Sequence, residues 1–164
     1  MALIQGAVAV FIVVSGFSLA LSPARHDWRL TRGAGSFFQR RAWRILPTYY
    51  GALLLSCLVF GVVTPEQTGS QITLRSVLVH ALLVQDVVDS PDPNATFWSI
   101  AVECQIYLLF PLFVLVMRRA GAWWLVLGVS AAVLTVKALA GPVAPVASLL
   151  NLTPEFAALF VMGM

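Results

Sequence analysis

Long apolar runs separated by short polar stretches dominate the sequence. The runs cover residues 2–21, 46–63, 74–88, 97–117, 122–140 and about 154–164. A helix needs about 20 mostly apolar residues to cross the hydrocarbon core of a bilayer. Four runs reach that length, and the final run stops at the C-terminus after about 10 residues. The pattern therefore predicts an all-α, polytopic membrane helical bundle of four complete spans, with a truncated final span.

The run at 74–88 differs from the other runs. It is too short for a simple span, and it carries Arg75, His80 and Asp86. The charge distribution described below also places both of its ends on the same side of the membrane. We therefore expect an interfacial or re-entrant helix at 74–88.

Composition places the chain among integral membrane proteins. Sixty percent of its 164 residues are hydrophobic and only 10% are charged, whereas soluble domains are about one quarter charged. The formal net charge is +3. Membrane orientation explains the clustered arginines without a nucleic-acid partner, so none is expected.

Basic residues orient the predicted spans. The stretches 22–45 and 118–121 hold eight of the ten Lys and Arg residues, so both are predicted to be cytoplasmic. The acidic stretches 64–73 and 89–96 then lie outside. On this topology residue 1 also lies outside, and we expect a further span before it. The whole chain, residues 1–164, is predicted to be one partial membrane domain.

Glu103 lies within an apolar run, where an ionisable side chain costs about 2.5–3.5 kcal/mol to insert. Ser99, Glu103 and Tyr107 follow each other at i, i+4 spacing, so they share one helix face. The carboxylate is either a functional group or a structural hydrogen-bonding partner. The residues alone leave both alternatives open.

Arg40, Arg41 and Arg44 stand at the start of the second predicted span and can gather on one side of a helix. Guanidinium groups bind phosphate oxygens in a bidentate way, so the cluster suits a phosphate-bearing ligand. Taken alone, the cluster is better explained as an anchor at the cytoplasmic face.

The other candidates carry weaker signals. Ser15 and Gly16 in the first span either allow close helix packing or border an active site. His26 and His80 lie outside any recognised catalytic motif. The two cysteines have no metal-ligand spacing, and the sequence predicts no metal site.

Three stretches in order resemble landmarks of the acyltransferase 3 family of membrane O-acyltransferases. They are VFIVVSGFSLA, SFFQRRAWRILPTYY and FWSIAVECQIYLLFP, within about residues 7–111. The resemblance implies acyl transfer, often of acetyl from acetyl-CoA or another acyl-CoA, to a hydroxyl of a carbohydrate or lipid-linked glycan outside the cytoplasm. It implies a bacterial plasma-membrane location and no metal. It also implies that Arg41 and Arg44 bind the CoA phosphates, and that Glu103 and Tyr107 are catalytic.

Two departures from the family pattern qualify this resemblance. Cys104 stands where the family usually has a second acid, and Ile106 replaces an aromatic residue. The family's proposed catalytic histidine lies on a helix before the first landmark, and neither histidine here occupies that place. We therefore expect residues 1–164 to be inactive alone. A transporter or channel fragment and a structural membrane subunit are the alternatives.

Overall fold

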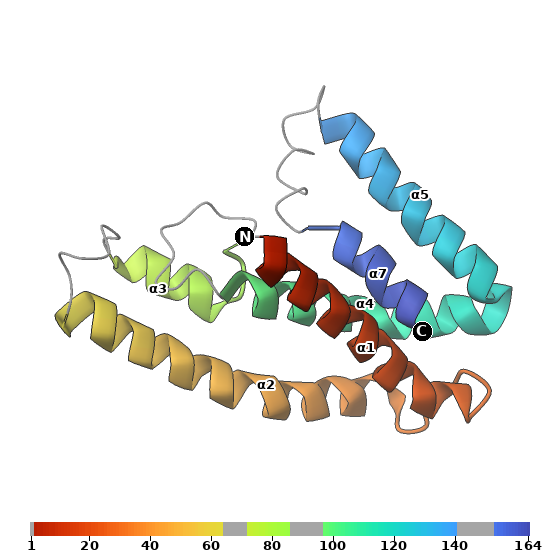
Figure 1. The fold of residues 1–164 in the computed structure, drawn as a ribbon. Helices are drawn as coiled ribbons and strands as arrows, with labels where there is room; N and C mark the ends of the chain where they lie inside the picture. The colour runs from red at the N-terminus through yellow and green to blue at the C-terminus, as the bar shows by residue number, and fades with distance from the viewer. Residues whose placement is uncertain (1, 64–71, 86–96, 141–152) are drawn as a thin grey trace.

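The structure is a computed structural model that describes residues 2–63, 72–85, 97–140 and 153–164 (Figure 1). Its elements in these parts are α1 (Ala2–Ala24), α2 (Gly33–Leu58), a π-helical turn η1 (Val59–Val63), α3 (Leu74–Ala81), α4 (Phe97–Ala120), α5 (Ala122–Ala140) and α7 (Glu155–Gly163). Within the described residues there is no strand, which confirms the all-α prediction. In the same described parts, four helices are long and apolar enough to cross a membrane: Gly6–Ala24, Gly33–Gly61, Phe97–Ala120 and Ala122–Ala140.

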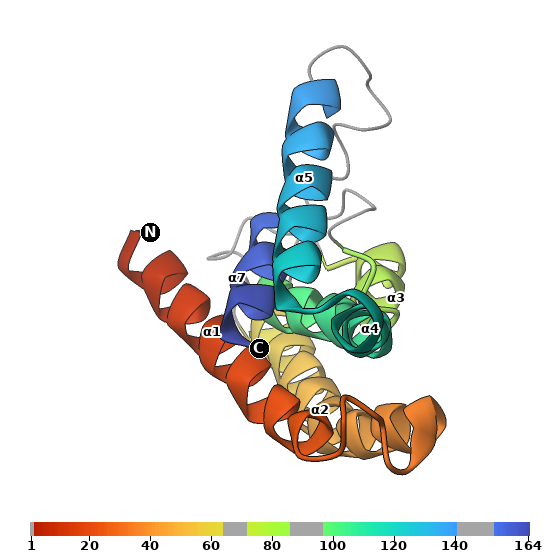
Figure 2. The ribbon, with the colours of Figure 1, turned by 90° about the vertical axis from the view of Figure 1, so that its right-hand side faces the viewer.

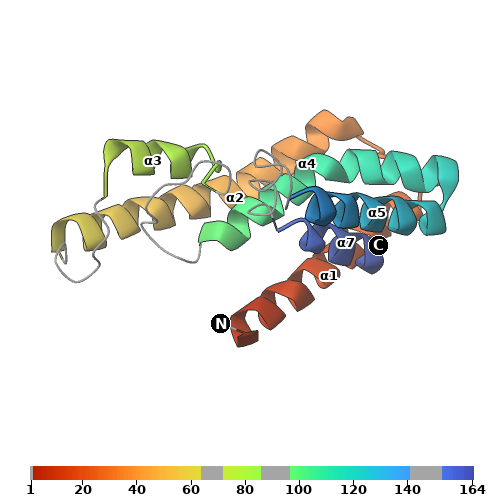
Figure 3. The same ribbon diagram turned by 90° about the horizontal axis from the view of Figure 1, so that it is seen from above.

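The short α7 lies between α1 and α5, and it also contacts α4 (Figures 1 and 2). Helix α4 runs beside α2 (Figure 3), and α5 leaves the end of α4 at a steep angle (Figures 1 and 2). The main core gathers on the inner face of α4 with contributions from α1, α2, α5 and α7. Its largest buried members include Ile12, Phe37, Tyr107, Phe110 and Phe160.

The second long helix begins much earlier than the apolar pattern predicted. The prediction placed a span at 46–63 and a loop over 22–45, but α2 starts at Gly33 and only residues 25–32 connect it to α1. Arginine is a good helix former, so the helix continues beyond the apolar run. Arg40, Arg41 and Arg44, which include the two predicted CoA-binding arginines Arg41 and Arg44, are consequently held on a regular helix.

Helix α3 is shorter than the predicted segment 74–88, and residues 86–88 lie outside the described part. The Thr73 side chain accepts a hydrogen bond from the Ser76 amide at 3.2 Å and caps its start. Two tyrosines of α2 fix its end, because Tyr49 donates to the His80 carbonyl at 2.7 Å and Tyr50 to the Ala81 carbonyl at 3.0 Å. Its interfacial or re-entrant placement stays a prediction.

Helices α1 and α7 approach each other closely where both carry glycine. A Cβ atom added to Gly16 would overlap the backbone carbonyl of Phe160, and one added to Gly163 would overlap that of Val13. Small residues permit such contact between membrane helices. Gly16 therefore has the packing role that was one of its two predicted explanations.

The two arginine-bearing connections, residues 25–32 and the turn at Gly121, lie toward the same end of the molecule (Figures 1 and 3). Gly121 has a φ of 87°, a left-handed conformation suited to ending α4 before α5 begins. Two connections on the same side of a membrane must lie at the same end of the helices, as these do. The cytoplasmic assignment of 22–45 and 118–121 stays a prediction. Most of the predicted outer stretches 64–73 and 89–96 lies outside the described residues.

Candidate functional site

A pocket of about 370 Å³ opens between the C-terminal half of α1, the 25–32 connection and the start of α2. Five of its lining residues are Arg29, Arg32, Arg40, Arg41 and Arg44. Apart from Phe110 of α4, every lining residue lies between Ser18 and Arg44. We call this the arginine pocket.

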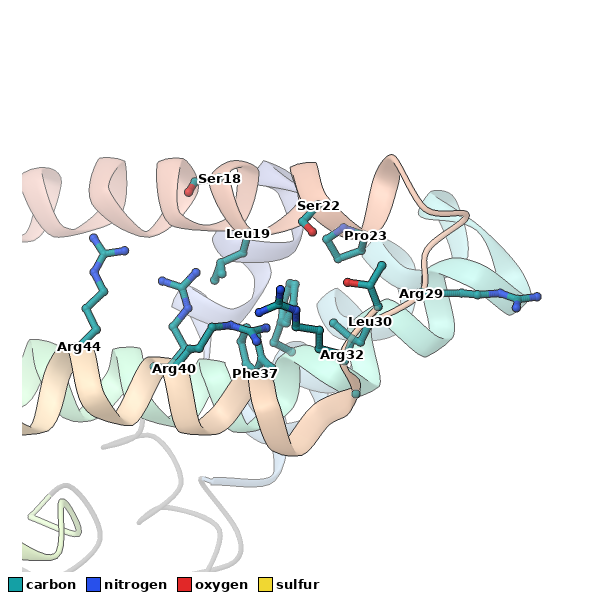
Figure 4. Close-up of a pocket in the computed structure, with 14 residues that line it drawn as sticks. Ser18, Leu19, Ser22, Pro23, Arg29, Leu30, Arg32, Phe37, Arg40 and Arg44 are labelled. Carbon is teal, nitrogen blue, oxygen red and sulfur yellow. The ribbon is translucent and has the colours of Figure 1, made fainter.

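Helical spacing and a tight connection together build the arginine pocket. Arg40 and Arg44 are one turn apart on α2, and both side chains extend toward α1 near Ser18 (Figure 4). The connection turns back because the amides of His26 and Trp28 both bond to the Pro23 carbonyl, at 2.9 and 2.8 Å. This turn brings Arg29 and Arg32 to the same pocket as the helical arginines.

The arginine pocket carries a concentrated positive charge. In the described part of the chain, no carboxylate forms an ion pair with any of its five arginines. Arg40 and Arg44 are exposed, so their guanidinium groups are open to a ligand. Multiple guanidinium forks around one cavity suit a ligand with several phosphate oxygens.

Arg41 links the arginine pocket to α4. Its guanidinium carbon lies 5.8 Å from the ring centre of Phe37 and 5.4 Å from that of Tyr107. Cation–π contacts of this kind fix the plane and position of the guanidinium group. Phe37 in turn stacks on Phe110, with ring centres 4.9 Å apart. The charged wall of the pocket is therefore supported by buried aromatic packing.

Polar side chains from three helices meet behind Arg41. Tyr107 donates a hydrogen bond from its hydroxyl to Oε1 of Glu103, one turn earlier on α4. The Ser15 side chain of α1 lies near the same hydroxyl. This confirms the predicted shared face for Glu103 and Tyr107. The structure also brings Ser15 and Arg41 to them, although these residues are distant in the sequence.

Sequence reasoning found only part of this constellation. Arg29 and Arg32 were counted as topology signals, and nothing in their spacing placed them beside Arg40. The 25–32 connection was hidden inside a longer predicted loop, so its turn could not be anticipated. Phe110 carried no signal, because a phenylalanine in an apolar run looks the same whether it faces lipid or a pocket.

Neither histidine lines the arginine pocket. His80 is fully buried on α3, where its Nδ1 is 2.8 Å from the Ser76 carbonyl and its ring packs edge-on to Phe97. His26 is exposed in the connection after α1 and does not line the pocket. Among the described residues, no group of three His, Cys, Asp or Glu side chains could hold a metal ion.

Comparison with known proteins gives consistent results. A family model described as an acyltransferase domain matches residues 2–164. The chain is 31% identical over 138 residues to "Acyltransferase MdmB" of Streptomyces mycarofaciens, covering 79% of this chain and 34% of that protein. It is 28% identical over 123 residues to "Putative peptidoglycan O-acetyltransferase YrhL" of Bacillus subtilis (strain 168), covering 66% of this chain and 19% of that protein.

No solved structure gives a significant match to the chain. The chain spans about a third of the length of the first of these relatives and about a fifth of the second. The family match, by contrast, extends over the whole described structure and includes every residue of the arginine pocket. Together with the four apolar helices, it indicates an integral membrane protein. The chain belongs to the acyltransferase 3 family.

Proposed function

We propose that this chain forms the donor-binding part of a membrane O-acyltransferase. The enzyme moves an acyl group, with acetyl as the simplest case, from a CoA donor to a hydroxyl of a carbohydrate or lipid-linked glycan. The observation that carries the proposal is the arginine pocket, whose residue Arg41 also contacts Tyr107. Family membership favours this enzyme over the transporter and structural-subunit alternatives.

In this proposal the arginines hold the phosphates of the donor. Arg40, Arg41 and Arg44 supply charge-assisted hydrogen bonds from one helix, and Arg32 extends the binding surface, whereas the Arg29 side chain points away from the pocket (Figure 4). CoA carries several phosphate groups at one end and the reactive thioester at the other. Phosphates in the arginine pocket leave the thioester free to extend past Arg41 toward Tyr107 and Glu103.

The Glu103–Tyr107 pair then serves the transfer step. The acceptor hydroxyl attacks the thioester carbonyl, the carbon–sulfur bond breaks and an ester forms. Glu103 takes the proton of the hydroxyl through Tyr107 and then returns this proton to the departing CoA thiolate, which becomes the free thiol. The Tyr107 hydroxyl already donates to Glu103. A hydrogen bond from the acceptor hydroxyl to the Tyr107 oxygen therefore completes the path of the proton to Glu103.

The names and sources of the relatives support the proposed acceptor class and location. One relative is named as a peptidoglycan O-acetyltransferase, which supports a glycan acceptor here. Both relatives are bacterial, and this supports a bacterial plasma membrane. With 22–45 and 118–121 facing the cytoplasm, the arginine pocket opens to the compartment where CoA donors are made.

Donor binding by the purified chain tests the proposal. We expect Arg44→Ala to weaken desulfo-CoA binding about tenfold or more in a calorimetric titration in detergent, because a charged hydrogen bond contributes about 1.5–3 kcal/mol. Arg118→Ala is the matched control, since Arg118 lies on the basic end of α4 but does not line the pocket. Equal affinity for the Arg44→Ala variant and the unmodified chain would refute the assigned role.

A further inference from the structure

A second pocket, of about 440 Å³, lies between α2, α4 and the residues that come directly after α3. We call it the apolar pocket, because aliphatic and aromatic side chains form most of its lining. Ile45 and Leu46 line it from α2, Leu82 follows α3, and Leu108 belongs to α4. Its volume falls in the usual range for small-molecule sites, about 300–1,000 Å³.

The apolar pocket adjoins the arginine pocket through one residue. Arg41 lines both pockets, and Tyr107 lines the apolar one. The guanidinium group of Arg41 faces the ring of Tyr107, whose hydroxyl bonds to Glu103. Tyr107, which the proposed function assigns to the transfer step, therefore lies beside the one residue that lines both pockets.

A single ligand with phosphates at one end and a hydrocarbon chain at the other matches both pockets. We infer that the apolar pocket binds the acyl chain of the donor, so that this site accepts acyl-CoA donors with chains longer than acetyl. The inference rests on the proposed CoA donor. An acetyl group adds one methyl beyond the thioester carbonyl, whereas several aliphatic side chains, Leu82 and Leu108 among them, line the pocket beside Tyr107.

The first test measures affinity against chain length. Desulfo-CoA, acetyl-CoA, butyryl-CoA and octanoyl-CoA are titrated into the purified chain in detergent. Burial of each additional methylene raises affinity about fourfold, so affinity climbs along the series until the pocket is full. Affinity that stays level from acetyl-CoA to octanoyl-CoA overturns the inference.

A pair of variants separates the pocket from binding of long chains to micelles. Ala42→Phe places a ring in the apolar pocket, which Ala42 lines, and is expected to remove the gain from butyryl-CoA and octanoyl-CoA. Gly51→Phe is the matched control on the same helix, because a Cβ atom added there meets nothing within 4 Å. It keeps the gain. Equal chain-length dependence in both variants overturns the inference.

The two cysteines supply an independent readout. Cys104 lines the apolar pocket, whereas Cys57 lies further along α2 and does not line it. At equal occupancy of the chain, octanoyl-CoA is expected to slow maleimide labelling of Cys104 at least threefold, and desulfo-CoA is not. Labelling of Cys57 stays constant with both ligands. Unprotected Cys104 in the octanoyl-CoA complex contradicts the inference.

The same experiments distinguish this inference from the proposed function. If desulfo-CoA binds and Arg44→Ala weakens it, but chain length has no effect, the acyl-chain site is wrong and the donor pocket stands. If no CoA compound binds, the proposed donor pocket is wrong and the acyl-chain site falls with it.

Discussion

Helices α4 and α5 are consecutive, similarly apolar and both long enough to cross a membrane, yet they occupy different environments. Of the most apolar part of α4, 44% is buried within the described structure, against 6% for α5. Helix α4 buries Ile106, Phe110 and Phe113, whereas α5 leaves Trp124 and Leu127 exposed. Lipid tails are as apolar as a helix interface, so hydropathy identifies both helices without separating their roles.

The largest expected effect is loss of packing on α4. Phe110→Ala removes a ring that is 1% exposed and stacks on Phe37, so it should lower the free energy of unfolding by about 3–5 kcal/mol. Leu127→Ala on α5, where the side chain is 57% exposed, should change it by less than about 0.5 kcal/mol. SDS-driven unfolding in mixed micelles measures both values. Similar losses would show that α4 and α5 are equally engaged.

Glu103 on α4 and Glu155, which pairs with Lys137 of α5, should differ in their effect on the rate of acyl transfer. Glu103→Gln keeps the size of the side chain but removes the proton acceptor, and should lower acyl transfer about a hundredfold. Glu155→Gln, beside Lys137 of α5, should leave the rate within about twofold, since that ion pair is exposed. Membranes from cells expressing the native gene product provide the assay. A rate within twofold of normal for Glu103→Gln would remove this residue from the proposed mechanism.

A third comparison uses glycines. Gly16→Ala would force a Cβ atom against the Phe160 carbonyl, and should destabilise the α1–α7 contact by about 1–3 kcal/mol. Gly128→Ala on α5 meets nothing within 4 Å, so it should be neutral or slightly stabilising because alanine favours helix. The unfolding titration in SDS measures both variants. Equal destabilisation would mean that Gly128 is also at a helix contact.

The smallest expected effect concerns the ion pair that joins α5 to α7. Lys137 Nζ and Glu155 Oε2 are 3.7 Å apart, and both side chains are 48% exposed. Lys137→Ala should therefore reduce the free energy of unfolding by less than about 1 kcal/mol. Thr135→Ala, whose exposed hydroxyl donates to the Ala131 carbonyl at 2.8 Å within α5, is a control for helix effects. A loss above about 2 kcal/mol for Lys137→Ala alone would indicate that α5 depends on this pair.

These contrasts explain which parts of the molecule could be predicted from sequence. The spans were found because a bilayer requires long, internally hydrogen-bonded apolar segments. Glu103 and Tyr107 were placed on one face because helical spacing is a local property. The start of α2 at Gly33 was missed, since arginines at the membrane edge interrupt the apolar pattern without interrupting the helix.

In the candidate site, too, local features were predictable and contacts between helices were not. Spacing predicted that Arg40, Arg41 and Arg44 share one side of a helix. It could not bring Ser15 to Tyr107, because that contact depends on how α1 packs against α4. Arg29 and Arg32 reach the arginine pocket through the turn built on the Pro23 carbonyl. Tertiary geometry, and not local pattern, supplies these members.

The locality of the arginine pocket has a consequence for biogenesis. Nearly all of its lining comes from one helical hairpin, between Ser18 and Arg44, and short loops close at little entropic cost. During synthesis the residues of this hairpin are made before those of α4. The arginine pocket, apart from Phe110 of α4, can therefore form as soon as α1 and the start of α2 meet. The Arg41–Tyr107 contact must wait for α4, so docking of that helix is the step that brings Tyr107 and Glu103 to the arginines of the hairpin.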